Sequence, residues 1–186
     1  MSLEVMLDIE TMSVRSNAAI VAIGAVKFDP RGPVGELGDP NDPEYQHFHV
    51  SVDLGSCIEA ELHVEGRTVM WWMDQSNEAR AVLRADPNLP LDHALSRFFV
   101  WFGQTPMPTW GNGAGFDNVI VRNAYDQLGG VAPFRFYDDR CFRTMKALAP
   151  NIPYVKPLVP HNALEDAKAQ AVHLQKVFAQ LVPARD

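Results

Sequence analysis

The stretch EVMLDIE at residues 4–10 decides the fold, because its apolar and acidic residues alternate as in a β-strand. Val5, Leu7 and Ile9 share one face of this expected strand. Asp8 and Glu10 emerge together on one face as well, since side chains two apart in a strand point the same way. The sequence therefore predicts a buried strand that carries two neighbouring carboxylates.

A divalent cation would relieve the repulsion between these two acids. Like charges on one face of a buried strand are costly unless a positive charge lies between them. Mg²⁺ prefers carboxylate oxygens and keeps several of its waters. Far along the chain, Asp117 follows a glycine and a phenylalanine, and His161 stands five residues before Asp166. Together these residues suggest a metal-dependent phosphoryl-transfer site.

The composition is that of a soluble globular protein. With 186 residues, the chain is expected to form one domain, residues 1–186, with a full core. No apolar run approaches the roughly 18 residues of a membrane span, and the N-terminus lacks the pattern of a signal peptide. Cys57 and Cys141 are isolated, which fits a reducing compartment. We therefore expect a cytoplasmic protein with no membrane partner.

The net charge of −7 at first argues against nucleic acid as a partner, because nucleic-acid binders are usually basic. Two bound Mg²⁺ ions would add four positive charges and bring −7 to −3. A protein that grips one strand end also needs fewer phosphate contacts than a duplex binder. Weak, salt-sensitive binding of nucleic acid is therefore compatible with this composition.

The pattern predicts a mixed α/β sheet. Apolar or alternating runs predict strands at residues 4–10, 18–28, 45–52, 108–110 and 134–137. Helical spacing predicts helices at residues 67–84 (broken near 75–77), 91–102, 117–128, 140–148 and 163–181, with loops at 30–43 and 150–160. Three strands followed by strand–helix alternation indicate the α/β class. The acids fall at strand ends and helix starts, which we expect to converge on one sheet edge.

Asp117 has two interpretations. Aspartate is a favoured helix N-cap, so Asp117 can simply cap the helix that it begins. The apolar residues that follow would anchor this helix and give Asp117 a fixed position, as a metal ligand requires. Gly111, Gly113 and Gly115 lack the spacing and the Gly-Lys-Ser/Thr ending of a phosphate loop.

The start of the last helix also carries more than a cap. Asn162 and Glu165 fit a capping box, but that box explains neither His161 nor Asp166. The ordinary pKa of histidine, near 6.5, suits a general base at neutral pH. We therefore predict that His161 activates a water molecule beside the metal ligand Asp166.

Three motifs appear in order along the chain: Asp8-Ile9-Glu10-Thr11, Asn112-x-x-x-Phe116-Asp117 and His161-x-x-x-x-Asp166. In order and rough separation they resemble the motifs of the DEDDh (DnaQ-like) 3′–5′ exonucleases, which have a ribonuclease H-like fold. The related DEDDy branch places a tyrosine where this chain has Asn162. Trp71-Trp72-Met73 adds a resemblance to the phage-type and bacterial group of single-strand exonucleases and exoribonucleases.

The resemblance implies a ribonuclease H-like mixed five-stranded sheet with flanking helices, and two Mg²⁺ or Mn²⁺ ions. Asp8, Glu10 and Asp166 would hold one ion, with Asp8 bridging to a second that Asp117 supports. The two ions, about 4 Å apart, would clamp the scissile phosphate while His161 deprotonates the attacking water. The product would be a nucleoside 5′-monophosphate cut from a 3′ end.

The predicted substrate contacts are Thr11, Met12, Asn112, Phe116 and Trp72. Met12 directly follows the first motif, where many family members have Thr-Gly-Leu instead of Thr-Met-Ser. An aromatic side chain can stack on a terminal base, which is worth about 1–3 kcal/mol per base. The alternative for Trp72 is a place in the core, where most helical aromatic residues lie.

Single-stranded DNA with a free 3′ end is the favoured partner. The first alternative keeps the chemistry but acts on RNA 3′ overhangs or short RNA. The second is a catalytically inactive scaffold that binds nucleic acid, although all four acids and the histidine are present. The third is a small-molecule phosphohydrolase. Small exonucleases of this fold are often dimers, so the resemblance also allows a homodimer.

Overall fold

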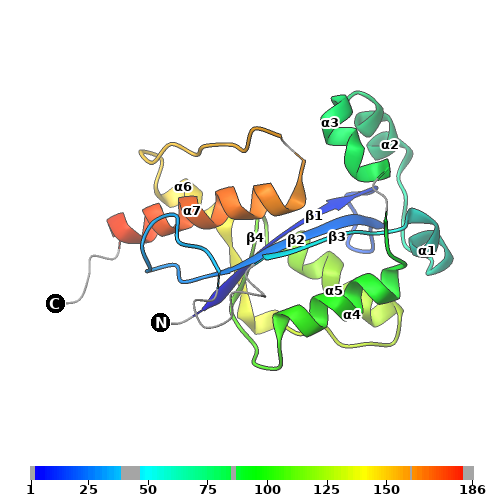
Figure 1. The fold of residues 1–186 in the computed structure, drawn as a ribbon, viewed down its shortest axis with the longest axis horizontal. Coiled ribbons are helices and arrows are strands. Elements are labelled where there is room, and N and C mark those ends of the chain that lie inside the picture. The colour runs from blue at the N-terminus through cyan, green and yellow to red at the C-terminus, as the bar shows by residue number, and fades with distance from the viewer. Residues whose placement is uncertain (1–2, 39–46, 85–86, 160, 182–186) are drawn as a thin grey trace.

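A mixed five-stranded sheet forms the centre of the computed structural model, which describes residues 3–38, 47–84, 87–159 and 161–181. The strand order is β3-β2-β1-β4-β5 (Figure 1). β1 pairs antiparallel with β2 and parallel with β4. The strands are β1 (Glu4–Thr11), β2 (Ile20–Phe28), β3 (His47–Ser51), β4 (Thr109–Gly111) and β5 (Asp139–Cys141).

Helices cover both faces of this sheet, with α7 and α6 on one side and α4 and α5 on the other (Figure 1). The described α-helices are α1 (Leu54–Glu59), α2 (Gly66–Met73), α3 (Asn77–Arg80), α4 (Leu91–Phe102), α5 (Asp117–Gln127), α6 (Phe142–Leu148) and α7 (Ala163–Leu181). Two short 3₁₀ helices, η2 (Ala81–Arg84) and η3 (Phe136–Asp138), connect other elements. No helix in these described ranges combines the length and the apolar character needed to cross a membrane.

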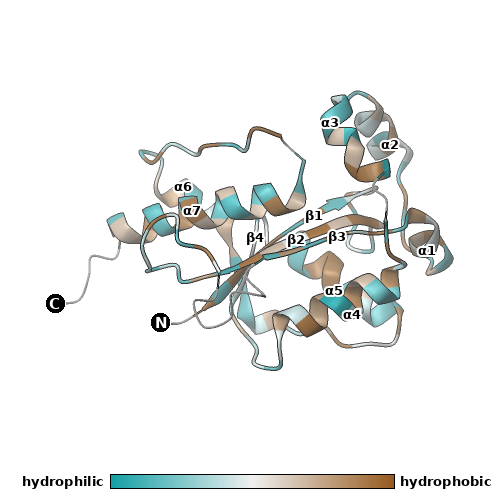
Figure 2. Cartoon of the chain, viewed as in Figure 1, coloured by the Kyte–Doolittle hydropathy of each residue, from teal (hydrophilic) through white to brown (hydrophobic). Residues whose placement is uncertain are grey.

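The alternation in β1 divides its side chains between two cores. Val5, Leu7 and Ile9 enter the larger core, which the aromatic residues of α4 complete. Met6 enters a smaller core that α6 and α7 close from the other side. Figure 2 shows the central strands as largely apolar between the two helical layers. The predicted alternation of the first strand is therefore confirmed, and burial of both faces places its acids inside the protein.

Gly24 on β2 allows α7 to lie directly against the sheet. It pairs with Asp8 on β1, and a Cβ atom at this position would overlap the backbone of Ala163 and Leu164. A residue without a side chain is therefore required where the first turn of α7 approaches. This close approach brings Asp166, in that first turn, near the carboxylates of β1.

The local helix signals are confirmed. The hydroxyl of Ser76 accepts a hydrogen bond from the backbone of Ala79 (3.2 Å), which starts α3 after the predicted break. The side chain of Asn162 accepts one from the backbone of Glu165 (3.2 Å) and caps α7 as predicted. Short polar side chains satisfy backbone donors that have no partner inside the helix.

The predicted strand at residues 134–137 is wrong. Phe134 is 1% exposed but Phe136 is 74% exposed, so the apparent alternation does not separate two faces. The carboxylate of Asp138 accepts hydrogen bonds from the backbone and the guanidinium of Arg135 at the start of η3, and this turn delays pairing with β4 until Asp139–Cys141. The helix predicted from residue 140 consequently begins at Phe142.

The remaining differences concern short segments. Helix α1, which Asp53 caps, was not predicted, since six residues carry too little periodicity to be recognised. The second strand begins at Ile20, and the helix predicted from residue 67 begins at Gly66. Residues 45–46 of the third predicted strand, residues 39–43 of the first predicted loop and residue 160 of the second lie outside the described residues.

Candidate active site

Three carboxylates converge at one edge of the sheet. Asp8 and Glu10 project from β1 towards the first turn of α7, which supplies Asp166. One carboxylate oxygen from each lies within 4.8 Å of the others. A register shift between Glu10 and Thr11 interrupts the pairing with β2 just here, as irregularities next to functional sites commonly do. The predicted same-face arrangement of the first two acids is thus part of a three-residue cluster.

The environment of the cluster favours neutral carboxyl groups as long as no cation is bound. Burial raises the pKa of Asp8 well above its ordinary range, and the charges of Asp117 and Glu10 raise it further. Burial also raises the pKa of Glu10 to about 8, with help from Asp166 and Asp117. The pKa of Asp166 is raised by burial too, against the opposing effect of His161. Negative charge concentrated in this way attracts a divalent cation.

Asp117 lies beside this cluster on another element. It is the first residue of α5, where Phe116 occupies the cap position and no side chain caps the helix, so the N-cap interpretation is wrong. Burial raises the pKa of Asp117 to about 7, although backbone hydrogen bonds from Asp117 itself, Ile9 and Asn112 oppose this. Its Oδ2 atom is buried without a hydrogen-bond partner among the described residues. A buried, unpartnered carboxylate oxygen facing further acids fits a metal ligand.

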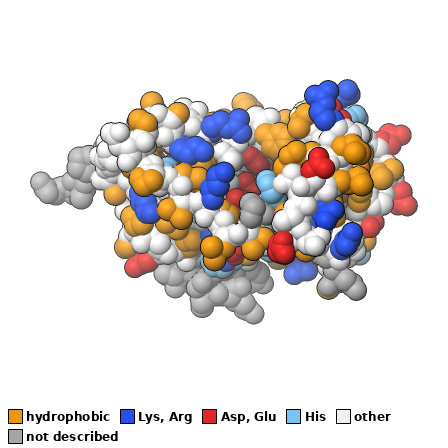
Figure 3. Space-filling view, turned by 90° about the horizontal axis from the view of Figure 1, so that it is seen from above, with side chains coloured by type: hydrophobic (Ala, Val, Ile, Leu, Met, Phe, Trp, Pro, Cys, Tyr) orange, Lys and Arg blue, Asp and Glu red, His pale blue; other side chains and the backbone are white. Residues whose placement is uncertain are grey.

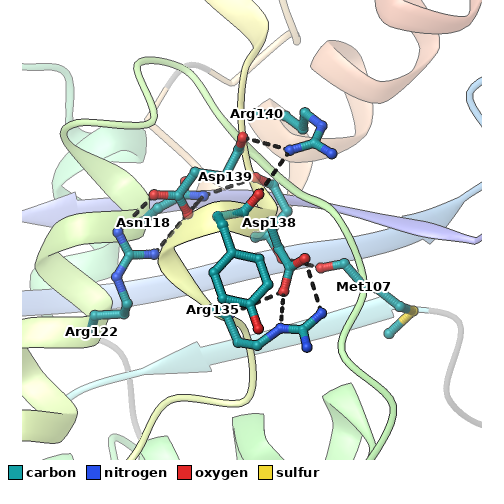
Figure 4. Close-up of polar contacts among 9 residues, drawn as sticks. Met107, Asn118, Arg122, Arg135, Asp138, Asp139 and Arg140 are labelled. Atoms are coloured by element: carbon teal, nitrogen blue, oxygen red, sulfur yellow. Dashed lines mark hydrogen bonds and ion pairs between the residues drawn. The ribbon is translucent and has the colours of Figure 1, made fainter.

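A polar network holds the start of α5 in place (Figure 4). The side chain of Asn118 donates to the backbone oxygen of Thr109 (2.8 Å) on β4 and to Oδ1 of Asp139 (2.9 Å) on β5. Arg122 donates two hydrogen bonds of 2.7 Å to the same carboxylate of Asp139. Since bidentate pairs fix geometry, this network positions the adjacent Asp117 relative to the sheet.

Gln170 is a site residue that the sequence reasoning missed. Its Nε2 atom donates a hydrogen bond of 2.7 Å to Oδ1 of Asp8, and both side chains are buried. Gln170 follows Asp166 by four residues, so the two share one face of α7. The spacing of four residues from Asp166 was the available sequence signal for Gln170. Glutamine is common in amphipathic helices, so this residue alone does not indicate a site.

His161 lies next to the acids, as predicted. Its Nδ1 atom is 4.0 Å from Oε1 of Glu10. The ring packs edge-on against Trp71 and Trp72, with centroid distances of 4.9 and 5.9 Å. Its backbone φ of 63° lies in the left-handed region, which costs a non-glycine residue roughly 1–3 kcal/mol and is frequent at functional sites.

A pocket of about 400 Å³ opens beside Glu10. Thr11 and Phe116, two of the predicted substrate contacts, line it together with Glu65, Arg67 and Trp71. Trp71 is 42% exposed and was not among the predicted contacts. Adjacent tryptophans on one helix turn point in different directions, so one of them had to face outward.

Two predicted contacts require correction. Trp72 is 1% exposed, and its indole donates a hydrogen bond of 2.9 Å to the backbone oxygen of Thr11, so the alternative place in the core is the correct one. Met12 is also buried, in the larger core, because the chain turns inward after the first motif. Asn112 is partly exposed outside the pocket lining, and its backbone oxygen accepts a hydrogen bond of 2.7 Å from Arg143; its contact with substrate stays a prediction.

Comparison with known proteins agrees with this geometry. Residues 3–178 match the family described as 3′-5′ exoribonuclease Rv2179c-like domain, and the chain belongs to this family. The chain is 25% identical over 157 residues to the exodeoxyribonuclease of Enterobacteria phage T4, an alignment that covers 74% of this chain and 68% of the phage protein. The predicted resemblance to 3′–5′ exonucleases is thereby confirmed.

Solved structures confirm the predicted fold. The zinc-bound complex of E. coli exonuclease I with single-stranded DNA matches with a TM-score of 0.62 and 17% identity, over 98% of this chain and 41% of that chain. A 3′-exonuclease studied for recognition of the 3′ end of a histone mRNA stem-loop matches with a TM-score of 0.59 and 10% identity, over 97% and 83%. The chain therefore spans less than half the length of exonuclease I.

Proposed function

We propose that this protein is a metal-dependent 3′–5′ exonuclease that releases nucleoside 5′-monophosphates from single-stranded nucleic acid. The observation that carries this proposal is the buried cluster of Asp8, Glu10 and Asp166, whose carboxylate oxygens lie within 4.8 Å of one another. Beside it lies a pocket of about 400 Å³, the size range of small-ligand sites. The family match adds independent support.

The residues fit two divalent cations, Mg²⁺ or Mn²⁺. Asp8, Glu10 and Asp166 would hold one, and Asp8 together with Asp117 would support the second. Bound there, the cations would supply Lewis acidity at the scissile phosphate and lower the pKa of the attacking water. The unpartnered Oδ2 of Asp117 agrees with this assignment, since it otherwise leaves a buried acceptor unsatisfied.

His161 would accept the proton of the attacking water. Its ring is partly exposed and lies beside Glu10, and the edge contacts of Trp71 and Trp72 hold it there. A positioned general base contributes about 10²–10⁴-fold to a rate. We therefore propose that His161→Ala lowers kcat by this factor.

The pocket would receive the terminal nucleotide. Trp71 and Phe116 line it and offer aromatic faces for stacking on a base. Thr11 and Arg67 supply polar groups for the sugar and phosphate. Stacking is tolerant of base identity, so we expect little sequence preference.

The sugar of the substrate is a separate question. The family description names an exoribonuclease, whereas the phage T4 relative is an exodeoxyribonuclease.

We propose that residues 1–186 act as one catalytic domain in the cytoplasm, where the free thiols of Cys57 and Cys141 suit a reducing compartment.

The test uses DNA and RNA oligonucleotides of one sequence, labelled at either end, with Mg²⁺, Mn²⁺ or EDTA. We expect metal-dependent release of mononucleotides from the 3′ end, which Asp8→Ala abolishes and which Asp92→Ala, an exposed acid on α4, leaves intact. The ratio of the DNA and RNA rates gives the sugar preference.

Two results would contradict the proposal. Binding without shortening under every condition would support an inactive scaffold. Hydrolysis of an aryl phosphate without shortening of any strand would support a small-molecule phosphohydrolase.

A further inference from the structure

The lysines of this acidic protein are gathered in one region. The chain carries a net charge of −7 and has only five lysines. Lys27 is buried and lies over the ring of Trp101. The other four belong to α6, to the loop that follows it and to α7, and they are Lys146, Lys156, Lys168 and Lys176. Figure 3 shows basic side chains gathered on this face, next to a hollow that contains acidic side chains.

Three of these lysines line a groove of about 340 Å³, which we call the lysine groove. Lys156 stands on its loop side, at residues 155–157, and Lys168 and Lys176 stand on its helix side. The lining residues of α7 recur every three or four positions and so form one stripe of the helix. The stripe that faces the sheet, with Ala167, Ala171 and Leu174, is a different one.

Most of the positive charge in the groove is free to meet a ligand. Lys168 pairs with Glu165 at 2.9 Å, the acidic residue in the lining. Within the described parts of the chain, neither Lys156 nor Lys176 has an ion-pair partner. The positive charge of the lysines also affects a neighbouring side chain. The pKa of His173 in the groove is lowered by burial, and the charges of Lys146 and Lys176 lower it further.

One end of the lysine groove lies near the carboxylate cluster, because its lining residue Glu165 directly precedes Asp166 on α7. The charge of Lys156 acts on Asp166, where it opposes the rise in pKa that burial causes. Lys168 follows Asp166 by two residues at the same end of α7. Lys176 lies eight residues further, which at 1.5 Å per residue is about 12 Å along the helix. Positive charge thus extends in one direction away from the site of hydrolysis.

We propose that the lysine groove binds the phosphate backbone of the substrate strand, upstream of the nucleotide that is removed. This inference rests on the proposed exonuclease function. Lysines act on phosphates as point charges and provide sequence-independent binding. A phosphate-binding path leading away from the acids explains how a protein with a net charge of −7 holds a polyanion.

The salt dependence of binding tests this proposal. Lys168→Gln/Lys176→Gln is compared with Arg84→Gln/Arg97→Gln, which removes the same charge from two exposed arginines outside the groove lining. Fluorescence anisotropy of a labelled single strand is recorded with Ca²⁺ over a series of KCl concentrations. Each phosphate contact on a single strand contributes about 0.7 to the slope of log K against log salt. We expect the lysine variant to lose about 1.4 from this slope and the arginine variant to keep it.

Kinetic measurements on substrates of two lengths distinguish an effect on binding in the groove from an effect on the catalytic site. We expect the single variant Lys176→Gln to show a raised KM for a long strand and an unchanged kcat/KM for a dinucleotide, which is too short to reach Lys176. An unchanged salt slope, or an equal loss in the arginine variant, would overturn the lysine groove while leaving the exonuclease proposal standing. If the unaltered protein shortens no strand, the proposed function fails, and the anisotropy slopes still decide whether the groove binds nucleic acid.

Discussion

The two faces of β1 carry opposite kinds of side chain, although they belong to one strand. Val5, Leu7 and Ile9 enter a core built with the aromatic residues of α4. On the α7 face, Met6 enters the smaller core, but the next two positions are Asp8 and Glu10. One face is apolar from Val5 to Ile9, whereas the other carries acids and, at Met6, a single apolar residue.

The α4 face and the α7 face of β1 therefore contribute differently to the stability of the fold. Burying a Val, Leu, Ile or Phe side chain contributes about 1.5–3 kcal/mol. Burying Asp8 and Glu10 lowers the stability of the fold as long as they are charged. Burial is the largest cause of their raised pKa values, which means that it disfavours the charged form. The α4 face therefore stabilises the protein, and the α7 face can keep charges together for a cation.

The largest expected effect comes from removing one charge of the acidic face. Asp8→Asn keeps an acceptor for Gln170 but removes the negative charge. We expect activity to fall by more than about 100-fold, since loss of an outer-sphere partner alone costs 10–100-fold. Thermal unfolding in EDTA should show a higher Tm for the variant, because a neutral amide avoids the cost of burying Asp8 as a charge or of protonating it on folding. Retained metal-dependent activity would contradict the ligand role of Asp8.

Truncating a side chain on the apolar face should have the reverse effect, with lower stability and unchanged activity. Phe98 on α4 is fully buried and packs against Phe48, Trp101 and Phe102 at centroid distances of 5.3–5.9 Å. Phe98→Ala should lower the free energy of unfolding by about 3–5 kcal/mol and leave kcat unchanged below the Tm. Its matched control is Phe99→Ala, on the exposed side of the same helix, which should cost about 0.5 kcal/mol. Urea denaturation measures both.

Gln170 tests how the acidic face is held in position. Gln170→Leu removes the hydrogen bond to Asp8 at nearly constant size, and we expect a 10–100-fold weaker affinity for Mn²⁺. Gln175→Leu, on the same helix, loses bonds to the backbone of Asp29 and Glu36 instead. This control should lose stability without a change in metal affinity. Isothermal titration with Mn²⁺ measures the metal affinity of both variants. Equal affinities would contradict the role of Gln170 in positioning Asp8.

A further expected effect is a pH dependence of stability without metal. The pKa values of Glu10 and Asp117 rise to about 8 and about 7, from ordinary values of 4.5 and 3.8. Between these limits the folded protein binds more protons than the unfolded chain, so stability falls as pH rises. The decline is expected between about pH 4 and pH 8, and it is absent below pH 4. Urea denaturation in EDTA between pH 5 and pH 8 measures it, and saturating Mn²⁺ should remove the decline.

Sequence reasoning succeeded where the signal is local. Alternation placed Asp8 and Glu10 on one face, the break near residues 75–77 was expected, and Asn162 was predicted as the cap of α7. The family motifs also selected the acids that the structure brings together. It failed for β5, whose residues Asp139–Cys141 carry no apolar alternation and pair with β4 only because the preceding turn and the Arg122 ion pair place them there.

By itself, the sequence determined the two-faced first strand, the class of fold and the identity of the acids, because these follow from residue type and short spacing. Only the tertiary structure decided which tryptophan is buried, that Gln170 holds Asp8, and that Gly24 lets α7 close over the sheet. It also decided that lysines from a loop and a helix line one groove. The physical reason is that such contacts join residues far apart in the chain, and their distances are set by packing rather than by local backbone preference.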